Sequence, residues 1–159
     1  MSGREESRRG SGWAEGSPDV VHDDLDVGTT SGDAHLCVGP DGRSWCGYTN
    51  HLPFTGWLAR GVIGLMWNAP QAPPARPYPY VRVVRIDESS RTLIDQPDMF
   101  SNDFAIQYPT VAVNGRGDLA GAVTVGGGAR SPSVAGFIVD DLSPSPPAWE
   151  MHDLATGES

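Results

Sequence analysis

The feature that most constrains the fold is the segment 108–140, YPTVAVNGRGDLAGAVTVGGGARSPSVAGFIVD. Short apolar and β-branched runs alternate there with glycine-rich breaks, a pattern typical of antiparallel strands joined by tight turns. The runs are 110–113, 119–125 and 134–139, and the breaks are 114–117 and 126–128. Nowhere does a long stretch show the apolar spacing of a helix. The sequence therefore predicts an all-β fold.

The length and charge of the chain exclude several classes of function. A chain of 159 residues is long enough for one domain with a hydrophobic core. Its formal net charge of -9 would repel both phosphate backbones and anionic lipids, so we expect no nucleic-acid partner. The longest apolar run, 62–67, is too short to cross a bilayer, so no membrane span is expected.

The N-terminal segment 1–33 is acidic and rich in glycine and serine, with no periodic apolar positions. Such a segment cannot bury enough apolar surface to offset the entropy of ordering, so we expect disorder. It contains no apolar stretch typical of a secretory signal. His22, Asp23, Asp24 and Asp26 fall within it, and we interpret them as solvated acid rather than as a metal site, because hard cations need ligands held by a shaped loop.

An internal repeat organises the rest of the chain. We expect strands at 34–38 and 44–49 around a turn at 39–42, and this hairpin matches the central segment at a constant offset, the hairpin register. The matching pairs are Leu36 with Val111, Val38 with Val113, Gly42 with Gly117, and Thr49 with Thr124. Later strands match at a second, shorter offset, the third-strand register, through Pro79 with Pro132, Val81 with Val134, and Asp87 with Asp140.

The difference between the two registers predicts an insertion at 50–78 in the first copy. Fourth strands are expected at 91–94 and 148–152. We therefore predict two four-stranded units, 34–96 and 97–159, the second with a Pro-rich connection at 143–147. Within the insertion, 61–67 is expected to be an extra strand covering an edge. The Pro-rich run 68–79 is either a stiff connector or a ligand for an aromatic groove.

Repeated four-stranded units with glycine-rich turns are typical of a β-propeller. In addition, YPTVAVNGRGDLAGAVTVGG followed by SPSVAGFIVDD resembles the repeats of large secreted bacterial proteins of the sialidase-like β-propeller type. Those repeats pair a YPS(I/V)AVN–x–x–G hairpin with a xPSxxY–x–x–x–D strand. The resemblance implies a ring of six or seven blades, about two of which this chain supplies as a partial propeller, and a secreted or cell-surface location.

Sialidase-like proteins also carry an Asp-box turn resembling Ser-x-Asp-x-Gly-x-x-Trp. In residues 41–45, DGRSW, the glycine follows the aspartate directly, and the second copy lacks the box. The arginine cluster, the Tyr–Glu pair and the acid Asp of those enzymes have no counterparts that we can assign. No catalytic residue is therefore carried over.

Cys37 and Cys46 flank the first predicted turn. If Val38 faces Trp45 on the neighbouring strand, then Cys37 faces Cys46. The pair is either a cross-strand disulfide, which would place the protein outside the cytosol, or two small buried thiols.

The loop 98–104 mixes aromatic, acidic and amide side chains between the two units. Because loops that join propeller blades line the rim or the central channel, Asn102, Asp103 and Tyr108 are our candidates for contact with a sugar or a cation. The alternative is a connector whose phenylalanines pack under the next blade. Trp45, Tyr48, Trp57 and Trp67 likewise either stack on sugars or fill the space between sheets.

None of the histidines has the spacing that makes a zinc site specific, and no phosphate-binding or dinucleotide motif is present, so no metal or cofactor is expected. The favoured hypothesis is a non-catalytic binding or scaffold module of a secreted sialidase-like propeller, contacting carbohydrate or the remaining blades. One alternative is a fragment of a glycoside hydrolase of the exo-sialidase type whose catalytic residues lie in other blades. Another is a structural module for protein interaction.

Overall fold

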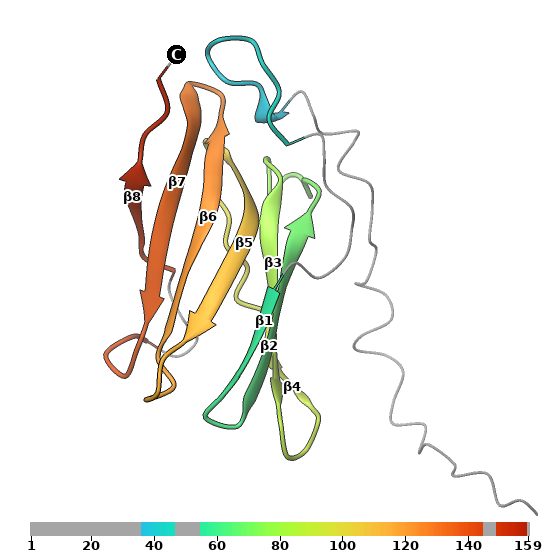
Figure 1. The fold of residues 1–159 in the computed structure, drawn as a ribbon. Helices are drawn as coiled ribbons and strands as arrows, with labels where there is room; N and C mark the ends of the chain where they lie inside the picture. Colours follow the sequence, from blue (N-terminus) through green and yellow to red (C-terminus); the bar gives the residue numbers. More distant parts are fainter. Residues whose placement is uncertain (1–35, 47–54, 145–148, 159) are drawn as a thin grey trace, which may run out of the picture.

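The chain folds into two antiparallel β-sheets of four strands each, without an α-helix in the described residues (Figure 1). The structure is a computed structural model and describes residues 36–46, 55–144 and 149–158. The predicted disorder of residues 1–33 and the acidic group around His22 lie outside this range. The expectation of an all-β fold with two four-stranded antiparallel units is confirmed.

Each sheet is a meander in which strands adjacent in the chain pair with each other. The first sheet contains β1 (Thr55–Ala59), β2 (Val62–Ala69), β3 (Tyr80–Asp87) and β4 (Leu93–Asp95). The second sheet contains β5 (Ala105–Val113), β6 (Leu119–Gly127), β7 (Arg130–Val139) and β8 (Met151–Ala155). The strands of the second sheet follow the predicted apolar runs, and β8 begins slightly later than the predicted fourth strand.

The strand assignment at the beginning of the first sheet was wrong. Val38 and Ser44 form a single bridge in a small hairpin outside both sheets. The sheet instead begins with β1 and β2, inside the stretch predicted as an insertion. The segment predicted to cover an edge is the central strand β2, which pairs with β1 on one side and β3 on the other.

The physical reason is strand length. The sequence offers two successive strand–turn–strand patterns, but the turn at Arg60 and Gly61 leads into the long strand β2, which can pair along both edges. Gly61 adopts a φ of 74°, which a glycine tolerates without strain. The hairpin register therefore aligned the second unit with the wrong hairpin.

The third-strand register agrees with the structure. Its matching residues lie on or next to β3 and β7, each the third strand of its sheet. Val81 pairs with Asn68 of β2, and its counterpart Val134 pairs with Thr124 of β6. Each strand ends at an aspartate, since Asp87 is the last residue of β3 and Asp140 directly follows β7.

The two sheets pack against each other around a shared apolar core, with β5 lying against β1, β2 and β3 (Figure 1). The aromatic rings of Phe137 and Trp149 meet edge to face within it, with centroids 5.2 Å apart. The buried core residues are Trp57, Met66, Val81, Val83, Met99, Ile106, Leu119, Val123, Val125, Ala135 and Phe137. Burial of these side chains supplies the main stabilisation of the pair of sheets.

The sheets use opposite faces to form this core. On β3, Val81 and Val83 are fully buried in the core. The counterpart of Val81 on β7, Val134, is 39% exposed, whereas the neighbouring Ala135 and Phe137 are buried. Alternate residues of a strand point to opposite faces, so the two sheets contribute non-equivalent faces to the core. The sheets are therefore stacked head to tail rather than related by a two-fold axis.

Candidate functional site

Two loops at the same end of the first sheet bring together a group of charged and aromatic side chains. The loop 70–79 joins β2 to β3, and the loop 96–104 joins β4 to β5. Val81 and Met99 exchange backbone hydrogen bonds of 3.1 and 2.9 Å, which fix the second loop beside the start of β3. We call Arg76, Tyr80, Arg82, Asp98 and Phe100 the arginine–aromatic cluster.

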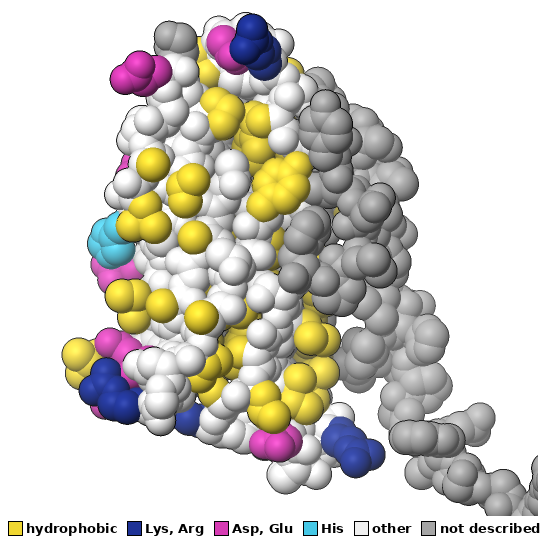
Figure 2. Space-filling model, in the orientation of Figure 1, with side chains coloured by type: hydrophobic (Ala, Val, Ile, Leu, Met, Phe, Trp, Pro, Cys, Tyr) yellow, Lys and Arg dark blue, Asp and Glu magenta, His cyan; other side chains and the backbone are white. Residues whose placement is uncertain are grey.

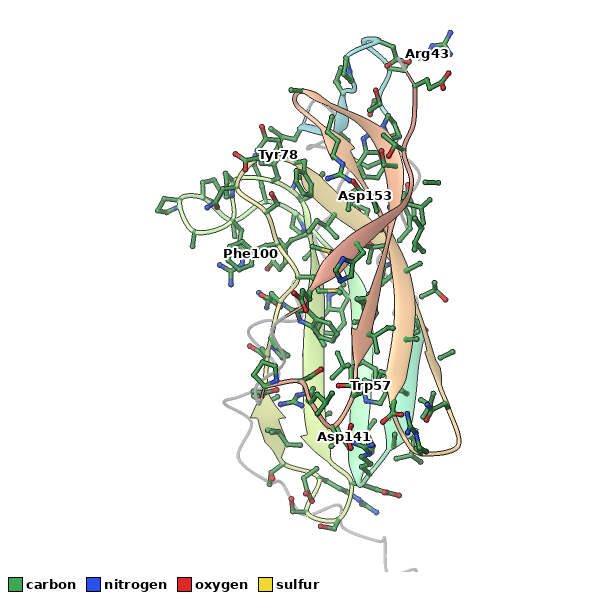
Figure 3. The ribbon with its side chains drawn as sticks, turned by 90° about the vertical axis from the view of Figure 1, so that its left-hand side faces the viewer. Arg43, Trp57, Tyr78, Phe100, Asp141 and Asp153 are labelled. Atoms are coloured by element: carbon green, nitrogen blue, oxygen red, sulfur yellow. A yellow bond between two sulfur atoms is a disulfide. The ribbon has the colours of Figure 1, made fainter. Side chains whose placement is uncertain are left out.

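Arg76 lies over Phe100, with its Cζ atom 3.7 Å from the centroid of the ring. The loop that carries Arg76 closes on itself, because the backbone groups of Ala72 and Arg76 pair at 2.8 and 2.9 Å. Phe100 itself is 41% exposed, and Figure 3 shows it beside the projecting loop that also carries Tyr78. Because the face of an aromatic ring attracts a cation, this contact helps to hold Arg76 in place beside the exposed ring.

The guanidinium of Arg76 makes few polar contacts of its own. One Nη atom donates to the carbonyl of Ala75 at 3.1 Å, and the other lies 3.8 Å from Oδ2 of Asp98. Among the described residues its Nε has no hydrogen-bond partner, but that atom is buried and is not accessible to a ligand. The side chain as a whole is 27% exposed, so it remains accessible to an oxygen of a ligand.

Asp98 holds the base of the cluster. Its Oδ1 accepts the backbone N–H of Val83 at 3.3 Å and lies 3.5 Å from Nε of Arg82. Arg82 also donates to the hydroxyl of Tyr80 at 2.6 Å, while burial raises the pKa of that hydroxyl above its usual value. With two arginines around one aspartate, the cluster carries a positive charge and favours an anionic ligand.

The residues predicted to bind a ligand lie in two places. Asn102 and Asp103 are exposed on the loop that carries Phe100. Tyr108 lies farther along β5, at a bulge where its φ is 56°, and its backbone N–H donates to Oδ1 of Asn68 at 2.8 Å. Its hydroxyl donates to the carbonyl of Trp45 at 3.3 Å, so Tyr108 anchors the hairpin 36–46 to the second sheet.

Sequence reasoning missed Arg76 because the Pro-rich run was interpreted as a connector. It is a connector, but one that presents an arginine to the aromatic ring of the next loop. The available signal was a single arginine among prolines, followed by two tyrosines, in ARPYPY. Prolines reduce the conformational freedom of such a loop and so favour a fixed position for the arginine.

The structure distinguishes among the tryptophans that sequence left open. Trp57 is only 8% exposed and covers Gly64 of the neighbouring strand, and Figure 3 shows it within the fold near the end opposite to Tyr78. Trp67 is also 8% exposed. Both fill space within the fold, whereas Trp45 is half-buried and packs at 6.2 Å from the ring of Tyr108.

Cys37 and Cys46 form a disulfide, with their Cα atoms 5.7 Å apart and both side chains fully buried. The expected register was one residue off, because Val38 pairs with Ser44 and the N–H of Trp45 donates to the carbonyl of Cys37. Ala105, Trp45 and Tyr78 pack around the two sulfurs. A disulfide is compatible with an extracellular location.

A second charged group lies at the opposite end and has a structural role. Asp118 accepts hydrogen bonds from Arg60 at 2.6 Å, from Asn114 at 2.8 Å and from Arg116 at 3.0 Å. The bond from Asn114, and then the nearby arginines, lower the pKa of Asp118. These contacts join the β1–β2 turn to the β5–β6 turn, beside a cavity of about 170 Å³.

Within the described ranges, no helix is long and apolar enough to cross a membrane. The same residues contain no group of three or more histidine, cysteine, aspartate or glutamate side chains arranged to hold a metal ion. Comparisons of the chain with protein-family models, with curated proteins and with solved structures give no match. A function must therefore be inferred from the geometry of the chain itself.

Proposed function

We propose that this chain is a non-catalytic binding module of a secreted sialidase-like β-propeller protein, and that its two sheets are consecutive blades. Three observations support the proposal: the meander order of both sheets, their head-to-tail packing, and the disulfide. Propeller blades are four-stranded meanders of this kind, stacked face to back around an axis.

The ligand that we propose is a carbohydrate bearing a carboxylate, bound at the arginine–aromatic cluster. The observation that carries this proposal is Arg76, whose partly exposed side chain lies on the exposed ring of Phe100. A carboxylate would accept hydrogen bonds from the guanidinium, and a sugar ring would pack on the remaining face of the aromatic ring.

Binding is favoured over hydrolysis by the environment of the acidic groups. A glycosidase needs two carboxyl groups facing each other across a cleft, one of them able to donate a proton. In the cluster, the side chain of Asp98 is 7% exposed and is engaged with Val83 and two arginines. A carboxylate held in this way orients the arginines and does not reach a glycosidic oxygen.

The test is a glycan array that pairs acidic glycans with their neutral or esterified forms. We expect the chain to bind the acidic member of a pair, and Arg76→Ala to weaken that binding by about 10- to 100-fold, the range of one or two charge-assisted hydrogen bonds. Phe100→Ala should also weaken it.

The matched control is Arg43→Ala, since Arg43 is an arginine with an 89% exposed side chain on the separate hairpin 36–46 (Figure 3). Its removal lowers the positive charge equally and should leave binding unchanged. Equal binding of acidic and neutral glycans, or equal effects of the two arginine substitutions, would contradict the proposed site. A folded chain that binds no glycan would favour the protein-interaction alternative.

A further inference from the structure

The outward face of the sheet β5–β8 is apolar and lacks a covering layer among the described residues. Hydrophobic side chains are spread over this side, a histidine and an acidic side chain lie at its left edge, and most of the other charged side chains gather toward the two ends (Figure 2). Ile138 and Leu154 are 65% and 66% exposed, and Val134 is 39% exposed. We call this surface the outer face; it is formed by Ala120, Ala122, Val134, Gly136, Ile138 and Leu154.

The third-strand register indicates what kind of surface would cover the outer face. Val134 and Gly136 of the outer face correspond to Val81 and Val83 in the third-strand register. Val81 and Val83 are fully buried, because the sheet β5–β8 covers them with its own opposite face. The outer face of the second sheet is therefore equivalent to the face of the first sheet that the second sheet covers.

The complementary surface is also present on the molecule. On the first sheet, the side opposite to the core carries Leu58, Leu65 and Ile86, and toward one end it also carries Tyr80 and Arg82 of the arginine–aromatic cluster; we call this side the rear face. Leu58 is 59% exposed, and Leu65 and Ile86 are partly exposed. In the second sheet the equivalent side carries Phe137 and Ala135, which correspond to Val84 and Arg82, and it forms the core.

We propose that the outer face binds the rear face of a second copy of this chain, which repeats the relation between the two sheets within one copy. The occupant is a second copy because its first sheet presents the rear face, whose exposed Leu58, Leu65 and Ile86 lie on the side equivalent to the surface that covers Val81 and Val83. Contiguous exposed apolar patches favour association. Because the two surfaces differ, the contact is heterologous and produces a closed ring or an open chain of copies.

The experiment uses the whole chain and measures its mass by light scattering over a range of concentrations. We expect species heavier than one copy for the natural chain, and single copies for both Ile138→Asp on the outer face and Leu58→Asp on the rear face. The control Thr92→Asp adds the same charge to an exposed turn and should leave the mass unchanged.

A mixture of the two variants makes the test specific. Each variant retains one intact face, so an equal mixture of Ile138→Asp and Leu58→Asp should form a dimer and nothing larger. A two-fold contact between two outer faces would instead leave the mixture no heavier than the Leu58→Asp variant alone. That result, or a natural chain of one copy at every concentration with a folded spectrum, would overturn the proposal.

The mass is measured without glycan, and the glycan array does not measure mass, so the two proposals fail separately. A chain that assembles without binding glycans leaves the interface standing. A chain that binds glycans as a single copy leaves the ligand site standing.

Discussion

The contact between Trp57 and Gly64 gives the sharpest test of the packing. Trp57 of β1 pairs with Gly64 of β2, and its indole covers the position where a larger residue would carry a Cβ atom. A Cβ built on Gly64 overlaps three atoms of the six-membered ring. Gly64→Ala must therefore displace an indole that belongs to the core shared by both sheets.

The expected energies follow from this overlap. Overpacking costs about 1–3 kcal/mol, and the gain from replacing a strand glycine by alanine recovers about 0.5–1 kcal/mol, so Gly64→Ala should destabilise the fold by about 1–2 kcal/mol. Trp57→Ala should cost about 3–5 kcal/mol. Once the indole is gone, Gly64→Ala has space and should be neutral or stabilising, which predicts a coupling energy of about 2 kcal/mol between the two sites.

The assay is urea unfolding of the four proteins of this double-mutant cycle, followed by circular dichroism and analysed by linear extrapolation. Gly115→Ala is the control, because a Cβ at that turn position meets nothing within 4 Å and its stability should stay close to that of the natural chain. If the two substitutions add within about 0.5 kcal/mol, the indole does not occupy the space above Gly64 and the core has been described wrongly.

Two further predictions concern the hairpin and the β3–β4 turn. Alkylation without reductant should leave Cys37 and Cys46 unmodified, and labelling of either thiol in the native protein would contradict the disulfide. Replacing both cysteines by serine should destabilise the hairpin by up to about 2.6 kcal/mol, the loop-closure value for their separation along the chain. Hydrogen bonds from Ser89 and Ser90 lower the pKa of Asp87 to about 2, so its contribution to stability should be complete above about pH 4 and should be lost as the pH falls from about 4 to 2. Asp87→Asn should remove this part of the acid dependence, and an unchanged acid profile would show that the turn does not hold the carboxylate.

The first three strands of the second sheet could be predicted from sequence because the connections between them are short. The turn after β5 is fixed locally, with Oδ1 of Asn114 accepting the N–H groups of Arg116 and Asp118 at 2.8 and 3.0 Å. Runs of apolar residues separated by such turns have one way to pair. The first sheet was harder, because the hairpin closed by Cys37 and Cys46 has the same local pattern as β1 and β2, and local pattern does not reveal which hairpin joins β3.

The candidate site could be predicted from sequence only in part. The loop containing Asn102 and Asp103 was expected to face a ligand, and it does carry Phe100 of the cluster. Its essential partner, Arg76, lies on an earlier loop, and the two meet only because β3 and β4 place both loops at one end of the sheet. Spacing along the chain contains no information about such a contact until the strand order is known.

The proposed assembly depends on one property of the repeat. In the third-strand register, a residue of β3 that points into the core matches a residue of β7 that points out of it. That register matches Val81 with Val134, so that one is exposed where the other is buried. A shift by one position would instead match Val81 with the buried Ala135, and the two sheets would then bury the same face and close on each other.

The proline that precedes β3, the proline inside β7 and the aspartate that follows each of them keep the same spacing in both copies. Proline cannot donate within a ladder, which limits where it can stand in a strand. At the other end, Asp87 and Asp140 accept hydrogen bonds from the turns that follow. The constant spacing between this proline and this aspartate is therefore the sequence feature that relates the buried face of β3 to the exposed outer face.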